Sequence, residues 1–185
     1  MKRIAKFHKV SLEQFKKDWI DTFGLDEEAN IEEIYENIKL PRRATAGSAG
    51  YDFFAPVRLI LEPGETIKIP TGIRVEMEPE WVLKCYPRSG LGFKYRLQLN
   101  NTVGIIDSDY FYSDNEGHIF IKITNDTKVK YDDYIAYISK MPRKKIEIKQ
   151  GEGFAQGIFL PYGLTVDDDC TGVRNGGFGS TDKKE

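Results

Sequence analysis

From residue 41 onward the chain consists of short runs of β-branched and aromatic residues, separated by Gly, Pro, Asn and Asp. Brief apolar runs between frequent turn residues are typical of strands. This pattern predicts an all-β sandwich or barrel and not a βαβ sheet. The expected strands lie within YDFFAPVRLIL (51–61), ETIKIPTGIRVEM (65–77), WVLKCYP (81–87), GHIFIKITN (117–125) and YIAYISK (134–140).

The first 40 residues have a different pattern. IAKFHKV (4–10) alternates over a short range and predicts a strand. Ser11, with Gln14 three residues later, forms a candidate capping box and predicts a helix that ends at Gly24. Isoleucines and a tyrosine at helical spacing predict a second short helix over residues 31–38. The apolar face of the first helix consists of Leu12, Phe15, Trp19, Ile20 and Phe23.

A chain of 185 residues is long enough for one domain with a full hydrophobic core. We expect a single domain over residues 1–185, in which residues 11–38 form a small helical insertion. The amphipathic helices either pack against the barrel or a neighbouring subunit, or form a surface that binds a protein partner. The sequence leaves both alternatives open.

The chain carries 27 basic and 29 acidic residues, and its formal charge of −2 provides no bulk attraction to DNA, RNA or an anionic membrane. No apolar run approaches the length of a membrane span. We therefore expect no nucleic-acid partner and no membrane partner. Any recognition of phosphate must be local.

Two cysteines, Cys85 and Cys170, are too few for a disulfide scaffold, and no secretory signal sequence opens the chain. A reducing, cytoplasmic location is the simplest expectation. The cysteines and the two histidines, His8 and His118, show no metal-ligand spacing. Neither a zinc site nor Cys/His nucleophilic chemistry is expected.

The sequence near the C-terminus, VRNGGFGSTD (173–182), is a composition that can hardly fold by itself. Its glycine backbone can approach a ligand closely, but ordering it costs entropy that contacts outside the tail must offset. Four other segments share this mixture of glycine and a few polar groups. They are SAGYDFFAP (48–56), YPRSGLGFK (86–94), NNTVGIIDSDY (100–110) and GFAQG (153–157).

Residue types alone leave the roles of these segments open. Asp52, two residues after Gly50, is typical of a turn. Arg88 and Ser89 belong either to an ordinary turn or to a backbone nest that binds phosphate oxygens. Asp107 and Asp109, expected on an extended segment, would point to the same face. There they could share a metal, act as a base, or lie in solvent.

Taken in order, the five segments strongly resemble the five motifs of the homotrimeric dUTPase family (deoxyuridine 5′-triphosphate nucleotidohydrolase). The resemblance runs from about residue 40 to residue 182 and leaves the helical insertion unexplained. It implies a jelly-roll-like β subunit that forms a homotrimer with shared active sites. Residues 171–185 would then be a mobile C-terminal lid that closes over the nucleotide of a neighbouring subunit.

The resemblance also implies Mg²⁺-assisted hydrolysis of dUTP to dUMP and pyrophosphate, without a covalent intermediate. Asp107 would orient and activate the water that attacks the α-phosphorus. Tyr110 would pack under the deoxyribose and leave no room for a 2′-hydroxyl. A fixed hairpin would reject cytosine, whose amino group replaces the acceptor of uracil. Uracil would be recognised by Asn101, Gly104, Ile105 and Ile106.

The remaining matched residues would surround the phosphates and the metal. Asp52 would lie near the Mg²⁺ ion, through water. Arg174 would hold the γ-phosphate, and Phe178 would stack on uracil. Further phosphate contacts are implied for Arg88, Ser89, Gly90, Gln156, Gly179, Ser180 and Thr181.

Three features depart from the family pattern. Arg174 stands one residue nearer GGFG than in many members, and Asp182 replaces a common glycine, so the reach of the arginine is in question. GFAQ lacks the arginine and the aliphatic residue that usually precede AQ. After Tyr110, FYSDNE intervenes before Gly117 and lengthens the hairpin beside the base pocket, which bears on uracil specificity.

Two other functions stay open. One is a catalytically idle dUTPase-like protein that senses dUTP or regulates a partner. The other is the related dCTP deaminase, whose chemistry needs a positioned acid/base group. HIFIKITN (118–125) offers no glutamate where the deaminases carry one.

Overall fold

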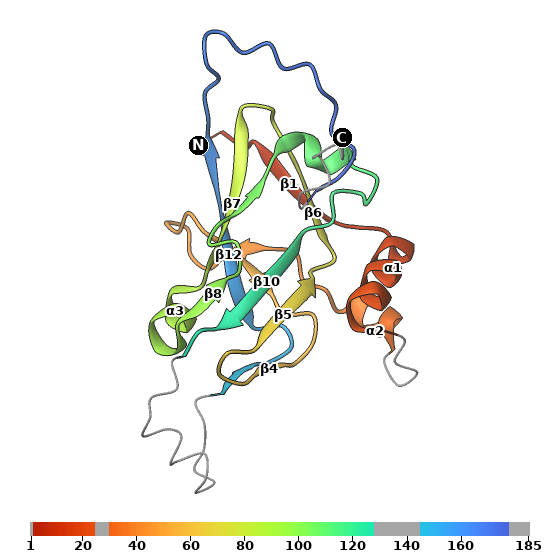
Figure 1. Ribbon diagram of the computed structural model, residues 1–185, viewed down its shortest axis with the longest axis vertical. Helices are drawn as coiled ribbons and strands as arrows, with labels where there is room; N and C mark the ends of the chain where they lie inside the picture. Colours follow the sequence, from red (N-terminus) through yellow and green to blue (C-terminus); the bar gives the residue numbers. More distant parts are fainter. Residues whose placement is uncertain (1, 25–29, 128–144, 178–185) are drawn as a thin grey trace, which may run out of the picture.

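The computed structural model describes residues 2–24, 30–127 and 145–177 of the chain. Within these ranges every strand pairing is antiparallel. The strands run through the body of the molecule in a jelly-roll-like arrangement, and the short helices lie at its periphery (Figure 1). The all-β prediction is therefore confirmed.

Four sheets make up the β structure of the described residues. The largest has the strand order β2–β3–β12–β7–β9, so β12 lies at its centre and β9 at one edge. Its strands are β2 (Arg42–Arg43), β3 (Tyr51–Phe54), β12 (Gly153–Pro161), β7 (Trp81–Pro87) and β9 (Gly104–Ile106).

The smaller sheets place the remaining strands around this one. A three-stranded sheet has the order β5–β10–β8, and two pairs are formed by β1 with β6 and by β11 with β4. The strands are β1 (Ala5–Lys9), β4 (Leu59–Leu61), β5 (Thr66–Pro70), β6 (Ile73–Met77), β8 (Leu97–Leu99), β10 (Phe120–Asn125) and β11 (Ile146–Ile148).

Two of the expected strand runs are interrupted. The run over 51–61 splits into β3 and β4 around Pro56, which has no N–H to give to a ladder. The run over 65–77 splits into β5 and β6 at Gly72, whose φ of 70° favours glycine. In contrast, WVLKCYP forms β7 over its whole length. The strand expected over 134–140 lies outside the described residues.

The N-terminal helices form where the sequence predicts them. The helix α1 (Leu12–Phe23) begins at Ser11, whose hydroxyl accepts a hydrogen bond from the amide of Gln14 at 3.1 Å. It ends at Gly24, where φ is 81°. The helix α2 (Ile31–Glu36) follows and packs against α1. No described helix is both long enough and apolar enough to cross a lipid bilayer.

The apolar face of α1 is part of the main core. Phe15 and Trp19 are buried in the same cluster as inward-facing strand residues such as Phe53, Leu83 and Phe154. Full burial of a large apolar side chain contributes about 1.5–3 kcal/mol relative to exposure. The helical insertion therefore shares its hydrophobic core with the strands.

One segment differs from the sequence expectation. The turn expected at PRSG (87–90) is wrong in its second half, because Ser89 and Gly90 are the first residues of a short helix, α3 (Ser89–Tyr95), which lies at the lower left in Figure 1. Glycines at positions 90 and 92 make this segment a poor helix former. The helix forms because Leu91 and Tyr95 pack against the core, and Arg96 closes it in the left-handed conformation with φ of 53°.

Candidate active site

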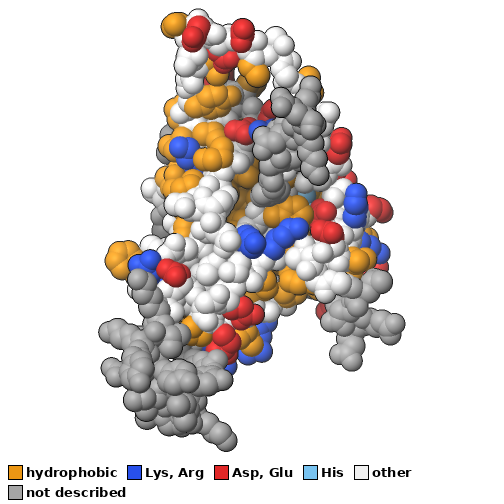
Figure 2. Space-filling model, viewed as in Figure 1, with side chains coloured by type: hydrophobic (Ala, Val, Ile, Leu, Met, Phe, Trp, Pro, Cys, Tyr) orange, Lys and Arg blue, Asp and Glu red, His pale blue; other side chains and the backbone are white. Residues whose placement is uncertain are grey.

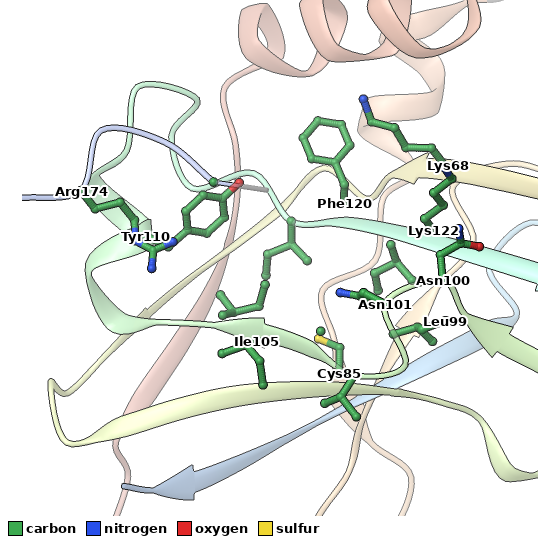
Figure 3. Close-up of a pocket in the computed structure, with 16 residues that line it drawn as sticks. Lys68, Cys85, Leu99, Asn100, Asn101, Ile105, Tyr110, Phe120, Lys122 and Arg174 are labelled. Carbon is green, nitrogen blue, oxygen red and sulfur yellow. The ribbon is translucent and has the colours of Figure 1, made fainter. Parts of the chain in front are cut away.

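A pocket of about 540 Å³ opens between the segment that joins β8 to β9, strand β10 and the C-terminal segment (Figure 3). The first of these, here called the hairpin (residues 99–106), connects strands of two different sheets that do not pair with each other. Asn101, Gly104, Ile105 and Ile106 from the hairpin region form one wall. Tyr110 and Arg174 lie together at one end of the pocket, and Lys68, Phe120 and Lys122 lie at the other. Six residues predicted to bind substrate are therefore brought to one cavity.

The hairpin is held tightly against β7. Gly104 pairs with Cys85 in the strand register, and a Cβ at Gly104 would lie 3.1 Å from the Cβ of Cys85. Thr102 takes the left-handed conformation with φ of 65°, and its amide donates to the carbonyl of Leu99 at 2.9 Å. The outer edge of β9 bears no further strand within the described ranges. Backbone groups on that edge are thus placed to face a ligand.

Tyr110 is fixed by hydrogen bonds at its hydroxyl. It lies in a short 3₁₀ helix, η1 (Ser108–Tyr112), and its hydroxyl donates to the carbonyl of His118 at 2.8 Å. Nδ2 of Asn115 donates to the same hydroxyl at 2.8 Å. Burial is the main cause that raises the pKa of Tyr110 above its ordinary value of 10.0. The ring therefore serves as a neutral, oriented wall and not as an acid near pH 7.

The C-terminal segment covers this ring. A Cβ at Gly177 would lie 2.6 Å from a ring carbon of Tyr110, so only glycine permits the observed approach. The guanidinium carbon of Arg174 lies 5.8 Å from the centre of the same ring. Tyr110 is only 3% exposed, in part because these two residues lie over it.

Asp107 and Asp109 both contact Arg174, but the extended segment predicted for this pair is wrong. Asp107 is the residue before η1 and Asp109 lies inside it, so the two carboxylates do not alternate along an extended strand. A guanidinium N–H of Arg174 donates to the carboxylate of Asp107. Its Nε lies 3.0 Å from Oδ1 of Asp109 as an ion pair. The 3₁₀ turn brings both carboxylates to one cation.

A second group of predicted residues lies on other elements. Nε of Arg88 lies 3.3 Å from Oδ1 of Asp52, and a Cβ at Gly153 would lie 2.8 Å from the Arg88 guanidinium. Gln156 is opposite Asp52 in the β12–β3 register, and its side chain donates to the carbonyl of Pro87 at 3.2 Å. Ser89 and Gly90 begin α3 beside this group. None of these residues is among the described residues that line the pocket.

The predicted site residues therefore form two groups within one described chain. The pocket group contains the hairpin, Tyr110, Asp107 and Arg174, and the second group contains Asp52, Arg88 and Gln156 with the start of α3. Predicted contacts by Phe178, Gly179, Ser180 and Thr181 lie outside the described residues.

Two lysines of the pocket were not predicted as site residues. Lys68 and Lys122 are directly opposite each other on β5 and β10, and both line the pocket. Strand alternation could have indicated that Lys122 points to the opposite face from its buried neighbours Ile121 and Ile123. Sequence alone could not indicate that Lys122 lines the same pocket as Asn101 and Gly104.

The described residues contain no group of three or more His, Cys, Asp or Glu side chains that could hold a metal ion. Asp52 provides a single carboxylate, whose side chain is 15% exposed. One carboxylate suits a Mg²⁺ ion that takes its other ligands from substrate phosphates and water. The donor set therefore fits a metal that arrives with a triphosphate.

Comparisons with known proteins agree with this arrangement. The family model described as dUTPase matches residues 36–182. The chain is 39% identical over 153 residues to the deoxyuridine 5′-triphosphate nucleotidohydrolase of Lactococcus lactis subsp. lactis (strain IL1403). That alignment covers 80% of this chain and 91% of the relative.

Solved structures are similar over most of their length. The crystal structure of dUTPase from Streptococcus mutans has 31% sequence identity and a TM-score of 0.57, and the match covers 86% of this chain and 97% of that one. A mutant dUTPase from phage phi11 of S. aureus has 19% identity and a TM-score of 0.60, covering 92% and 98% of the two chains. That phage protein coordinates a structural Mg(II) ion, and its likeness to this chain concerns the fold alone.

Proposed function

The chain belongs to the dUTPase family, and we propose that it hydrolyses dUTP to dUMP and pyrophosphate. The observation that carries this proposal is the junction of three features at one pocket. The hairpin, the fixed ring of Tyr110 and Arg174 line the same pocket, and Arg174 also donates to the carboxylate of Asp107. The reaction lowers dUTP and supplies dUMP.

The hairpin provides the recognition of uracil. The outer edge of β9 offers backbone donors and acceptors at fixed positions, and the side chain of Asn101 lies beside them. A base with an amino group in place of the uracil carbonyl leaves these polar groups unpaired, which costs about 1–3 kcal/mol per buried group. Tyr110 packs under the deoxyribose, where a 2′-hydroxyl finds no space.

Asp107 acts as the base. Its carboxylate is 42% exposed, so a water molecule can reach it once Arg174 has moved. The carboxylate orients this water and takes its proton as the oxygen attacks the α-phosphorus, and pyrophosphate leaves. A positioned general base contributes about 10²–10⁴-fold to the rate.

Cationic and amide groups hold the triphosphate. Arg174 exchanges its carboxylate partners for the γ-phosphate, since a guanidinium binds both kinds of anion through paired N–H groups. Arg88, Ser89, Gly90 and Gln156 contact the phosphate chain. Phe178 stacks on uracil, and Gly179, Ser180 and Thr181 contribute further phosphate donors.

Mg²⁺ would bind at this site together with the triphosphate of the substrate. Asp52 would hold the ion through water, and its pairing with Arg88 keeps the carboxylate directed toward the phosphate-binding group. A bound Mg²⁺ ion neutralises charge that develops on the departing pyrophosphate. Removal of Mg²⁺ with EDTA should strongly reduce turnover, and added Mg²⁺ should restore it.

A homotrimer would bring the two groups of site residues together. Within one chain the pocket group and the Asp52–Arg88 group are separate, as expected if each site takes segments from different subunits. Val166 and Val173 in the extended segment after β12 are fully or largely exposed in the single chain. Figure 2 shows hydrophobic side chains gathered on the upper part of one face, where β7 and this segment lie. These apolar surfaces suit burial between subunits.

Mixing experiments test the shared site. An Asp107→Asn protein and an Arg88→Ala protein should each lose most of the activity, and light scattering should show three subunits in each assembly. After subunit exchange, mixed trimers should regain part of the activity, because some sites then combine an intact Asp107 from one subunit with an intact Arg88 from another. If activity never returns in trimers shown to be mixed, each chain completes its own site.

A nucleotide panel tests the reaction itself. With Mg²⁺, dUTP should yield dUMP and pyrophosphate, whereas dCTP, dTTP and UTP should react far more slowly. Ammonia release from dCTP would indicate a deaminase instead. Deamination is disfavoured because β10, which borders the pocket with Phe120 and Lys122, carries no glutamate. Tight dUTP binding without pyrophosphate release would indicate a sensing protein.

Two free cysteines among the described residues, Cys85 and Cys170, accord with a cytoplasmic location.

A further inference from the structure

The lengthened hairpin after Tyr110 is held at one end by the start of α1. The backbone N–H and the hydroxyl of Ser11 donate to the two carboxylate oxygens of Glu116, at 2.8 and 2.6 Å. Arg74 lies 3.6 Å from the same carboxylate and donates to the carbonyl of Phe111 at 2.5 Å. Glu116 thus ties the inserted FYSDNE sequence to the N-terminal segment and to β6.

Two turns further along α1, a second contact reaches the end of the same hairpin. Nδ1 of His118 lies 2.5 Å from Oδ2 of Asp18, and Nε2 of His118 accepts from the amide of Gly72 at 2.7 Å. Because Nε2 is an acceptor, the ring is neutral and its Nδ1–H donates to Asp18. The imidazole is fully buried and is held at both nitrogens.

These contacts bear directly on Tyr110. The carbonyl that accepts from the Tyr110 hydroxyl belongs to His118, and the amide group that donates to that hydroxyl belongs to Asn115. Gly117 has φ of 67°, and a Cβ there would lie 2.5 Å from the carbonyl oxygen of Tyr110. Residues 115–118 are therefore packed directly onto η1, and any shift of this stretch moves the ring.

We propose that α1 positions Tyr110, through Asp18 acting on His118 and through Ser11 acting on Glu116. This inference rests on the proposed function, in which the ring selects deoxyribose over ribose. Neither Asp18 nor Glu116 is among the described residues that line the pocket, so both are positioning residues. The helical insertion thereby acquires a role in substrate selection.

The segment after Tyr110 needs these contacts with α1 because it is long. Each residue added to a flexible connection increases the number of conformations that it can adopt. A ring on a loose hairpin would sample positions that admit a 2′-hydroxyl, and a displacement of about 1 Å in a site can cost about 10²-fold in rate. Contacts on both sides of residue 117 reduce this freedom, because Ser11 holds the carboxylate of Glu116 and the carboxylate of Asp18 holds the ring of His118.

The test compares Asp18→Ala with Asp18→Asn and with Glu13→Ala. Glu13 is exposed on the same helix and serves as the matched control. The ratio of kcat/KM for dUTP to kcat/KM for UTP is measured at a temperature where circular dichroism shows every variant folded. Asp18→Ala should lower this ratio about fivefold or more, mainly by raising KM for dUTP. Asp18→Asn keeps an acceptor oxygen for His118 and should restore part of the ratio, and Glu13→Ala should not change it.

An unchanged ratio in Asp18→Ala, accompanied only by a lower melting temperature, would overturn the inference. An equal loss in Glu13→Ala would overturn it too. Amide hydrogen exchange supplies a measurement that does not depend on activity. Residues 110–118 should exchange faster in Asp18→Ala than in Glu13→Ala, and equal rates would contradict the positioning role. If the wild-type protein fails to hydrolyse dUTP, the proposed function fails, and the exchange comparison still decides the present inference.

Discussion

Arg174 donates a hydrogen bond to the carboxylate of Asp107, which lies 67 positions earlier in the chain. The pair joins the residue proposed to activate water with the residue proposed to hold the γ-phosphate. One N–H group of Arg174 is thus directed at this carboxylate. A triphosphate has to draw the guanidinium away before Asp107 can act on a water molecule.

Replacing Arg174 tests this exchange of partners. Arg174→Gln removes the cation from both anions, and we expect KM for dUTP to rise about tenfold, equivalent to about 1.4 kcal/mol. Arg174→Lys retains the charge but not the paired N–H groups, so it should recover only part of the affinity. Steady-state kinetics at constant ionic strength provide the measurement. A KM that does not change in Arg174→Gln would exclude a phosphate contact.

The approach of the tail to Tyr110 depends on a glycine. Gly177→Ala places a Cβ 2.6 Å from the ring, which cannot easily move because its hydroxyl is bonded on two sides. We expect faster amide exchange over residues 173–177 in this variant. Gly172→Ala is the matched control, since a Cβ there meets nothing within 4 Å. Similar exchange in both variants would show that the contact does not hold the tail.

The two cysteines should differ sharply in reactivity. Burial raises the pKa of the Cys85 thiol to about 12, whereas Cys170 is exposed. Because the thiolate is the nucleophile, Cys85 should stay unreactive near pH 8. A chromogenic disulfide reagent should titrate one thiol per native chain and two after denaturation. Rapid reaction of both thiols in the native protein would contradict the buried position of Cys85 in the wall of the pocket.

Acid should reveal the contribution of Asp18 to stability. Burial raises the pKa of its carboxyl, but the hydrogen bonds from His118 and Gln14 outweigh burial and leave this pKa below its ordinary value of 3.8. A lowered pKa in the folded state stabilises the protein above the unfolded pKa, and this contribution is lost as the pH falls. The difference in unfolding free energy between wild type and Asp18→Asn should be largest above about pH 5 and should shrink toward pH 3. A difference that stays constant over this range would mean that the Asp18 charge adds no stability.

The sequence was most informative where one local signal determined the structure. WVLKCYP predicted β7 over its full length, and the Ser11 cap with its apolar face predicted α1. Signals that depend on distant packing were missed. α3 contains two glycines and forms because Leu91 and Tyr95 reach the core, a contact that its own sequence does not reveal.

In the site, too, local sequence signals were predictive and contacts between distant residues were not. The resemblance predicted roles for Asp107, Tyr110 and the hairpin residues, which follow one another in the chain. Tyr110 and the hairpin residues line the pocket, and Asp107 is joined to it through Arg174. It did not indicate that Asp52 and Arg88 pair with each other, because their separation in sequence carries no information on distance. The contacts of Asp18 and Glu116 arise from two features outside the resemblance, and only the folded chain brings them together.

The central claim is that Asp107 activates the water that attacks the α-phosphorus. It is tested most directly by pyrophosphate release from saturating dUTP with Mg²⁺, comparing wild type with Asp107→Asn under conditions where both bind dUTP. We predict that the variant loses about 10²–10⁴-fold in kcat while its affinity for dUTP is retained. Turnover by Asp107→Asn within a few-fold of wild type would contradict the account.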